Sequence, residues 1–293
     1  MTRIVLILIR ILKKYFQMKK IIFLAAAISA NFILNAQNYC FSDPLIQFGF
    51  GNTTRSVTSY GDFDHNGAKD LVFIMPGSTN CGITVGMLDG NVSSTVNLTY
   101  SGSANTPRSA TVADFNGDGN DDIAVVCSGS NNVHIFLGNG TFGFSPSTFF
   151  NIGTAPFDIA SGDFNSDGKI DLAVVNNSSS NISVTYGVGN GTFSGTLTFG
   201  TPATGHSIQK GDFNNDNKID FVIASQANFV FMLTGNGLGS FAMAANISVS
   251  GSPFWAEPVD VNNDGNLEGV SRPPLTEFPL SNKSQYRLLV YET

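Results

Sequence analysis

The sequence has little of what builds several common classes of protein. It contains three cysteines and one tryptophan in 293 residues, and only 13% of its residues are charged. Three cysteines are too few for the disulfide framework that stabilises small secreted domains with little core. No stretch after residue 36 shows a sustained helical period, which excludes a helical bundle. We therefore expect an all-β chain.

Signatures of common catalytic sites are also missing. The sequence has no Gly-x-Ser-x-Gly elbow, zinc-protease helix, phosphate loop or Cys/His pairing. Outside the acidic loops considered below, Asp158 and Glu257 are the one carboxylate pair that a glycosidase could use. Polar lining of a wet channel is the interpretation of this pair that we favour. We expect a protein that is not an enzyme and has no nucleic-acid partner.

Long hydrophobic runs are confined to the amino terminus. Met18-Lys-Lys, an apolar stretch at 21–30 and the ending Leu34-Asn-Ala36 have the pattern of a secretory signal, with cleavage before Gln37. An uncleaved anchor is the alternative, but residues 21–36 provide 16 positions, and a spanning helix needs ~20. We predict that 1–36 is a signal-peptide region with its start at Met18. The mature chain, 37–293, is then secreted to the extracellular space, the cell surface or a periplasm, and does not span a membrane.

What the sequence has in quantity is a nine-residue acidic loop. Five copies begin at Asp62, Asp114, Asp163, Asp212 and Asp260, with successive starts 48 to 52 residues apart. A period of this size indicates one supersecondary unit per repeat. Three acidic side chains at predicted ligand positions in each of the five loops account for 15 of the 22 acidic residues. Acidity is therefore a property of the loops and not of the surface as a whole.

The composition of each loop is typical of a calcium site. Side-chain oxygens recur at positions 1, 3, 5 and 9, and position 7 can add its backbone carbonyl, which suits a hard divalent cation. Position 6 is glycine except for Asn217, and asparagine tolerates left-handed backbone angles, so we expect that loop to close as well. An EF-hand is excluded because position 9 leads straight into an apolar strand. The competing interpretation, solvated turns, is weakened by five copies in register.

The loops therefore predict up to five calcium ions. The predicted ligands are Asp62, Asp64, Asn66, Ala68 and Asp70; Asp114, Asn116, Asp118, Asn120 and Asp122; Asp163, Asn165, Asp167, Lys169 and Asp171; Asp212, Asn214, Asp216, Lys218 and Asp220; and Asp260, Asn262, Asp264, Asn266 and Glu268.

The third repeat shows the predicted strands most clearly. We expect strands at 157–162, 171–175, 182–186 and 193–199, with turns at 176–181 and 189–193. Four antiparallel strands per repeat make a β-propeller blade. Cys81 and Cys127 both fall near the turn between the second and third strands of adjacent blades, so they are the one pair that could bridge; unbridged thiols are the interpretation we favour.

The third repeat also carries a family resemblance. Gly162-Asp-Phe-Asn-Ser-Asp-Gly-Lys-Ile-Asp-Leu-Ala-Val-Val175, followed by Gly189-Asn-Gly-Thr-Phe193, closely resembles the FG-GAP or VCBS-type repeat of integrin α subunits and many secreted bacterial proteins. The resemblance covers roughly residues 50–272. It implies a calcium-binding propeller, and it leaves the ligand open because such repeats occur in adhesins, lectins and accessory domains of enzymes.

The number of blades has two interpretations. The chain is either a piece of a larger propeller, since propellers of this family often have seven blades, or a five-bladed ring. The segment 40–51 favours closure, because it lies where the outer strand of a preceding blade would lie. The last repeat has room for a third strand at 286–291 and then ends without an outer strand. We expect five blades closed by a shared strand, which would leave no open sheet edge.

A ligand surface is expected at the end of the inner strands that faces away from the loops. Ser56, Arg108, Phe157, His206 and Phe254 lie six positions before the loops and should surround the mouth of the channel, followed by Val57, Ser109, Asp158, Ser207 and Trp255. Their identities vary while the loops repeat, as expected of a recognition surface on a fixed scaffold. We take Arg108, Asp158, His206 and Trp255 as candidate ligand-binding residues; ordinary packing is the competing interpretation.

These observations predict a secreted, calcium-binding propeller that serves as a non-catalytic binding or adhesion module for a glycan or an extracellular protein. The alternative is a polysaccharide-active enzyme, a lyase or a glycosidase, or an accessory domain of one.

Overall fold

The computed structural model describes residues 56–74, 83–86, 95–98, 100–102, 106–249, 253, 255–259, 268–274, 276–279 and 287–292. The predicted signal peptide, the segment 40–51 and Cys81 lie outside these residues. Cys127 is buried at the end of β6, and the prediction that Cys81 and Cys127 are unbridged is not tested by the described residues.

The described residues form five four-stranded sheets and no helix. The first sheet contains β1 (Ser56–Gly61), β2 (Asp70–Ile74), β3 (Ile83–Gly86) and β4 (Thr95–Asn97). The second contains β5 (Pro107–Ala113), β6 (Asp122–Cys127), β7 (Asn132–Phe136) and β8 (Thr148–Asn151). The third contains β9 (Pro156–Gly162), β10 (Asp171–Asn176), β11 (Asn181–Gly187) and β12 (Phe193–Gly200).

The fourth sheet contains β13 (Gly205–Gly211), β14 (Asp220–Ser225), β15 (Phe229–Gly235) and β16 (Phe241–Ser248). The fifth contains β17 (Trp255–Val259), β18 (Glu268–Pro274), β19 (Thr276–Pro279) and β20 (Arg287–Glu292). In the first four sheets the strands pair in chain order and antiparallel, as propeller blades do.

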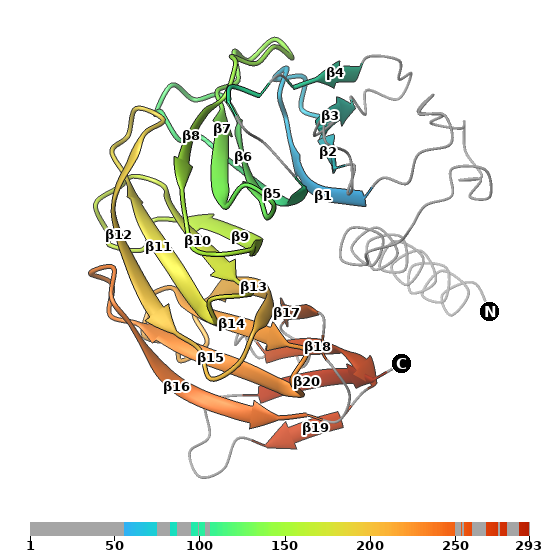
Figure 1. Cartoon of the computed structure of the whole chain (residues 1–293), viewed down its shortest axis with the longest axis vertical. Helices are drawn as coiled ribbons and strands as arrows, with labels where there is room; N and C mark the ends of the chain where they lie inside the picture. Colours follow the sequence, from blue (N-terminus) through green and yellow to red (C-terminus); the bar gives the residue numbers. More distant parts are fainter. Residues whose placement is uncertain are drawn as a thin grey trace, which may run out of the picture.

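The sheets follow one another around an arc, with β1, β5, β9, β13 and β17 toward the middle and β8, β12 and β16 at the rim (Figure 1). The all-β prediction is confirmed, and so are the strands of the third repeat to within one residue at each end. The described sheets form an open arc and not a closed ring. The predicted closing strand at 40–51 lies outside the described residues.

The fifth sheet differs from the prediction. Its order is β17-β18-β20-β19, so the last repeat supplies its own edge strand, and the expectation that it would end without one is wrong. Strand β20 pairs with β18 in parallel and with β19 in antiparallel orientation. Pro279 ends β19, and proline is tolerated at an edge because it cannot donate a ladder hydrogen bond. The edge position of β19 is therefore consistent with its sequence.

The core lies between neighbouring sheets, and the second strand of each blade supplies much of it. Every residue of β6, β10 and β14 is buried. Side chains alternate between the two faces of a strand, so Ile123 and Val125 pack toward the first sheet while Ala124 and Val126 pack toward the third. These strands therefore read as continuous apolar runs.

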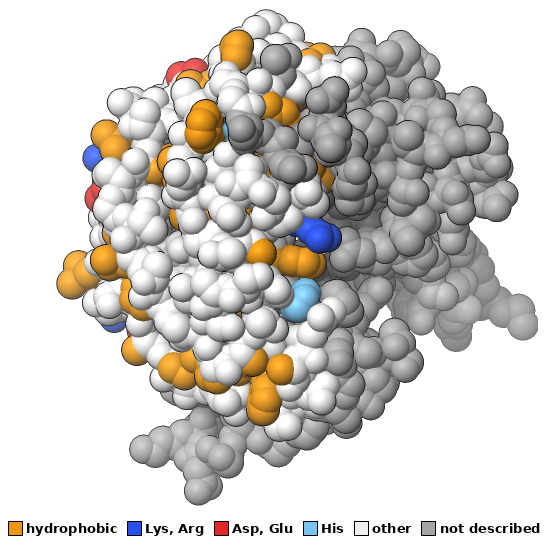
Figure 2. Space-filling model, viewed as in Figure 1, with side chains coloured by type: hydrophobic (Ala, Val, Ile, Leu, Met, Phe, Trp, Pro, Cys, Tyr) orange, Lys and Arg blue, Asp and Glu red, His pale blue; other side chains and the backbone are white. Residues whose placement is uncertain are grey.

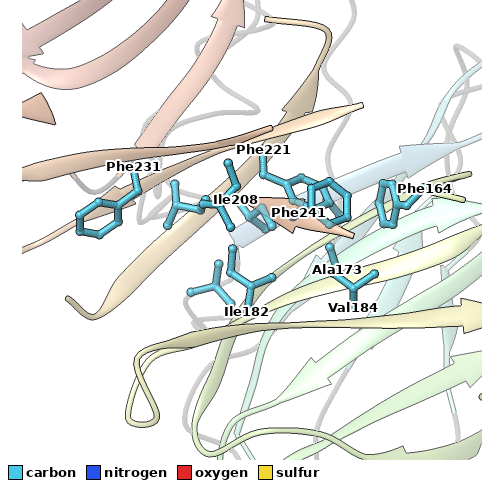
Figure 3. Packing of buried hydrophobic residues seen from close by; sticks show 12 residues of the cluster. Phe164, Ala173, Ile182, Val184, Ile208, Phe221, Phe231 and Phe241 are labelled. Carbon is cyan, nitrogen blue, oxygen red and sulfur yellow. The ribbon is translucent and has the colours of Figure 1, made fainter. Parts of the chain in front are cut away.

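Aromatic side chains fill the space between the third and fourth sheets (Figure 3). Phe221 lies between Phe164 and Phe241, with ring centroids 5.0 Å from the first in an edge-to-face arrangement and 4.3 Å from the second in a stacked one. Phe164 belongs to the third acidic loop and is 2% exposed. The second residue of the loop thus anchors it to the core between two blades.

Asp158 connects three inner strands. Its carboxylate accepts hydrogen bonds from the Ser109 hydroxyl of β5 at 2.6 Å and from the Ile208 N–H of β13 at 2.9 Å. The side chain is 6% exposed, and burial raises its pKa. Ser207, at the equivalent position of the next repeat, accepts the Ala256 N–H at 3.2 Å. A small polar side chain at this position therefore joins one blade to the next.

We expect Asp158→Ala to destabilise the protein by roughly 2–4 kcal/mol, because buried donors on two neighbouring blades lose their acceptor. Urea unfolding measures the change. Ser194→Ala, on the exposed strand β12, is the control and should shift the free energy of unfolding by less than about 0.5 kcal/mol. Equal effects of the two substitutions would show that Asp158 does not join the blades.

Candidate functional site

Each acidic loop lies between the first and second strands of its blade and is held by its own side chains. In the third loop, the position 1 carboxylate of Asp163 accepts the N–H groups of Asp167 and Gly168 at 3.1 and 2.8 Å. Asn165 accepts the Asp167 N–H at 2.9 Å, and Asp167 accepts the Lys169 N–H at 2.9 Å. The loop is therefore wrapped around the oxygens of positions 1, 3 and 5.

The same hydrogen bonds recur in the other described loops. Position 1 accepts the N–H of position 6 in every one, at 2.7 to 3.0 Å, through Asp62, Asp114, Asp163 and Asp212. Position 5 accepts the N–H of position 7 at 2.7 to 3.0 Å, through Asn66, Asp118, Asp167 and Asp216. Four loops with different sequences thus share one conformation.

Left-handed backbone angles occur at two positions of each described loop. At position 6, Asn217 has a φ of 61° where the other three loops have glycine, so the prediction that the fourth loop closes is confirmed. Position 4 is also left-handed, at His65, Gly117, Ser166 and Asn215. This second turn was not predicted from the sequence. Gly117 and Asn215 are residues that favour such angles. His65 and Ser166 do not, so position 4 has no residue type that predicts a left-handed turn.

The aspartate at position 9 is buried and makes hydrogen bonds through both oxygens. Asp171 accepts the Phe164 N–H at 2.9 Å and the Gly187 N–H at 2.8 Å, and it is fully buried. Asp122 and Asp220 make the same pair of bonds. This carboxylate joins the start of the loop to the end of the third strand.

Loss of solvent raises the pKa of the position 9 carboxyls, to about 6 for Asp122 and for Asp220. The N–H donors lower the pKa, and the carboxylates at positions 1 and 5 raise it further. The pKa of Asp171 is raised for the same reasons. Negative charges therefore converge on the inside of each loop.

The donor set fits a hard divalent cation. In the first loop, carboxylate oxygens of Asp62, Asp64 and Asp70 all lie within 4.8 Å of one another. Oxygen-only ligands and several carboxylates are what Ca²⁺ prefers. In loops 2 to 4, position 3 is asparagine and the third acid is at position 5. Of the fifth predicted site, Glu268 begins β18, and Asp260, Asn262, Asp264 and Asn266 lie outside the described residues.

Position 7 lysines lie beside the loop carboxylates. The Lys169 ammonium is 3.9 Å from Asp167, and that of Lys218 is 3.5 Å from Asp216. All four side chains are substantially exposed, so these ion pairs contribute little to stability.

At the opposite end of the inner strands, three of the predicted mouth residues form a row. The Arg108 guanidinium lies 5.0 Å from the centroid of the Phe157 ring, and the Phe157 ring is 4.7 Å from that of His206. The Arg108 Nε–H donates to the Ser128 hydroxyl at 3.3 Å, and the Asn177 side chain lies 3.3 Å from His206 Nε2. Contacts between successive blades thus fix the row.

Asp158 does not share this surface. The structure buries it between blades, with its oxygens taken up by hydrogen bonds. We therefore leave it out of the ligand surface. Trp255 lies on β17 and Glu257 on the same strand, and their side chains are outside the part that the structure describes.

The family model for the FG-GAP-like repeat matches the chain four times, at residues 62–125, 114–174, 163–223 and 212–270. Each match begins at the first aspartate of one loop and extends past the next loop. Together they cover more than half of the chain.

The chain belongs to the FG-GAP-like repeat proteins.

A search of curated proteins finds no relative of this FG-GAP-like chain. Similar solved structures include the periplasmic gluconolactonase PpgL of Pseudomonas aeruginosa, with 15% identity and a TM-score of 0.49 over 71% of this chain and 60% of that one. A functionally unknown protein of Desulfotomaculum acetoxidans has 17% identity and a TM-score of 0.45, over 66% and 56% of the two chains.

The Tc holotoxin pore of Photorhabdus luminescens has 19% identity and a TM-score of 0.43, over 77% of this chain and 11% of that one. In all three structures the match spans less than two thirds of the other chain. The described residues contain no helix that is long and apolar enough to span a membrane.

The FG-GAP loop geometry separates two roles of its acids. Asp171→Asn should destabilise the metal-free protein by about 1–3 kcal/mol, because an amide cannot accept both the Phe164 and the Gly187 N–H groups. Asp167→Asn keeps an oxygen for the Lys169 N–H and should cost less than about 0.5 kcal/mol. Urea unfolding with a chelator present measures both. If the two variants unfold alike, position 9 has no structural role beyond that of position 5.

Proposed function

We propose that this FG-GAP-like protein is a secreted, calcium-stabilised propeller that acts as a non-catalytic binding or adhesion module for a glycan or an extracellular protein. The observation that carries the proposal is the physical separation of the repeated acidic loops from the row of varying side chains. The acidic loops lie at one end of the inner strands, and the row of Arg108, Phe157 and His206 lies at the other. A strand such as β9 has seven residues, or roughly 23 Å at ~3.3 Å per residue.

Calcium is proposed to stabilise the scaffold. The side chains of positions 1, 3, 5 and 9 and the carbonyl of position 7 would hold it, at up to five sites. A divalent cation would offset the repulsion among the carboxylates that each loop brings together. The hydrogen bonds already made by positions 1, 3 and 5 orient these side chains, so binding would cost little ordering of the loop.

Export is supported by the signal-peptide pattern in residues 18–36 and by the FG-GAP-like repeats. The five sheets are proposed to be the blades of one propeller. The non-catalytic assignment is supported by Asp158: one acid of the only candidate carboxylate pair is buried and hydrogen-bonded to neighbouring blades.

Removal of calcium should lower the melting temperature, because a metal bound only by the folded state stabilises it. The effect should saturate at roughly 0.1–1 mM calcium if these sites resemble other extracellular calcium modules. Thermal melts across a calcium titration measure it. Asp167→Asn should reduce the calcium-dependent gain while leaving the melting temperature in chelator nearly unchanged. A melting curve that ignores both calcium and chelator would contradict the metal assignment.

Ligand binding is tested by retention of the calcium-loaded chain on arrays of glycans and extracellular proteins. We expect retention without turnover, weakened by His206→Ala and by Trp255→Ala, since both positions belong to the predicted mouth. Leu197→Ala, on the outer face of strand β12, is the control and should bind as the parent does. Release of product from a retained polysaccharide would contradict the non-catalytic assignment, and failure to retain any ligand would contradict the module itself.

A further inference from the structure

The side chains of the row formed by Arg108, Phe157 and His206 indicate which class of ligand this surface could bind. We propose that the row recognises an acidic polysaccharide through a carboxylate or sulfate group held by Arg108; this inference rests on the proposed binding function. This names the chemistry of the ligand, which the FG-GAP-like repeat leaves open.

The first support is the way in which Arg108 is held. Its guanidinium lies over the Phe157 ring, and its Nε–H donates to the Ser128 hydroxyl. These contacts leave the terminal nitrogens of the guanidinium available, and the side chain is exposed. A planar guanidinium supported on an aromatic ring is well suited to hold a planar or tetrahedral anion through two parallel hydrogen bonds. The position is therefore organised before a ligand arrives.

The second support is the charge around Arg108. The ion pairs of the described residues are Lys169 with Asp167 and Lys218 with Asp216, both in the acidic loops, so no described carboxylate neutralises Arg108. Next along the row, desolvation and, to a lesser extent, the nearby Arg108 charge lower the pKa of His206, which favours its neutral form. Among the described residues, the row thus presents one positive charge that has no ion-pair partner, on an acidic protein.

The third support is what surrounds the row, because it favours a glycan over a protein. The neighbouring turns between second and third strands carry hydroxyl and amide side chains, such as Ser128, Ser130, Asn177 and Ser179. Among the residues whose exposure the structure describes, which do not include Trp255, the exposed large hydrophobic residues lie on the outer strands, on β1 or in the turns after the third strands: Tyr60, Phe149, Val188, Leu197, Leu238 and Met243. Protein interfaces usually need a buried apolar or aromatic anchor.

The space-filling view agrees with this. Figure 2 shows a basic, a hydrophobic and a histidine side chain side by side near the middle of one face, and the described surface next to them is mostly neutral side chains and backbone. Neutral hydrogen-bonding groups around a single cation match a sugar polymer, whose hydroxyls are many and whose charges are spaced along the chain.

The test measures retention of the full, calcium-loaded chain on polygalacturonate, dextran sulfate, neutral dextran and polyglutamate. Arg108→Gln removes the charge, and Arg108→Lys keeps the charge without the planar fork. Lys69→Gln removes an equal charge from an exposed position in the first loop that supplies no predicted ligand. Calcium-dependent melting of each variant verifies that the fold is intact.

We expect retention on polygalacturonate, dextran sulfate or both, and the arm that retains the chain identifies the anionic group. Arg108→Gln should weaken it by roughly tenfold to a hundredfold, as for loss of a hydrogen bond to a charged group. Arg108→Lys should show an intermediate loss because it binds as a point charge. Lys69→Gln should bind as the parent does.

Several results would overturn the inference. Equal losses of retention in Arg108→Gln and Lys69→Gln would indicate unspecific electrostatic attraction. Retention that Arg108→Gln leaves unchanged would indicate that loop-bound calcium bridges the acidic glycan. Stronger retention on polyglutamate would indicate an acidic protein partner. Retention on neutral dextran alone, independent of Arg108, would be consistent with the proposed binding function but would refute the proposal of an acidic ligand. Absence of any ligand on the wider arrays would instead refute the proposed function.

Discussion

The buried aspartate at the end of each loop is the interaction on which both the loop and the packing of the blades depend. Asp171 receives the N–H of Phe164, so the start of the loop is fixed relative to the second strand. The carbonyl of Phe164 then accepts the N–H of Gly239 in the following repeat at 3.0 Å. One carboxylate therefore positions a residue that both fills the core between blades and bonds to the next blade.

The same chain of contacts recurs along the protein. The carbonyls of Phe63 and Phe115 accept N–H groups of Phe142 and Gly191, at 3.0 and 2.9 Å. In each case the acceptor is the second residue of a loop, and the donor is the turn after the third strand of the following blade. The glycine that ends the third strand, such as Gly187, is also required: a Cβ there would collide with the Ile170 carbonyl. Loop and turn motifs thus recur together because they touch across and within blades.

The local sequence pattern was enough to predict most of the strands and turns within one repeat. The strands at 157–162 and 171–175 could be read from the apolar runs, and the closure of the loop at Asn217 from the tolerance of asparagine for left-handed angles. The position 4 turn escaped detection because His65 and Ser166 give no compositional signal. Sequence periodicity describes a residue by its neighbours in the chain. The strands and the closure of the loop at Asn217 depend on such neighbours, so they could be predicted.

Contacts between repeats were harder to predict. Asp158 looked like a surface carboxylate, since its strand position matches that of Ser109 and Ser207, and its burial depends on an N–H donated by β13, about 50 residues away. The order of the fifth sheet has the same origin: β20 lies between β18 and β19 through non-local pairing in a repeat that departs from the pattern. No spacing rule within one repeat contains that information.

The two ends of the inner strands tolerate substitution differently, and this difference follows from these contacts. Substitutions in the loops are limited, because the side chains of positions 1, 2, 3, 5 and 9 have partners in their own loop, in the core or in the next blade. At the mouth, equivalent positions carry Arg108, Phe157 and His206, three different chemistries that contact one another without altering the strands beneath them. Side chains at the mouth can therefore change while the acidic loops, and the contacts that hold them, stay the same.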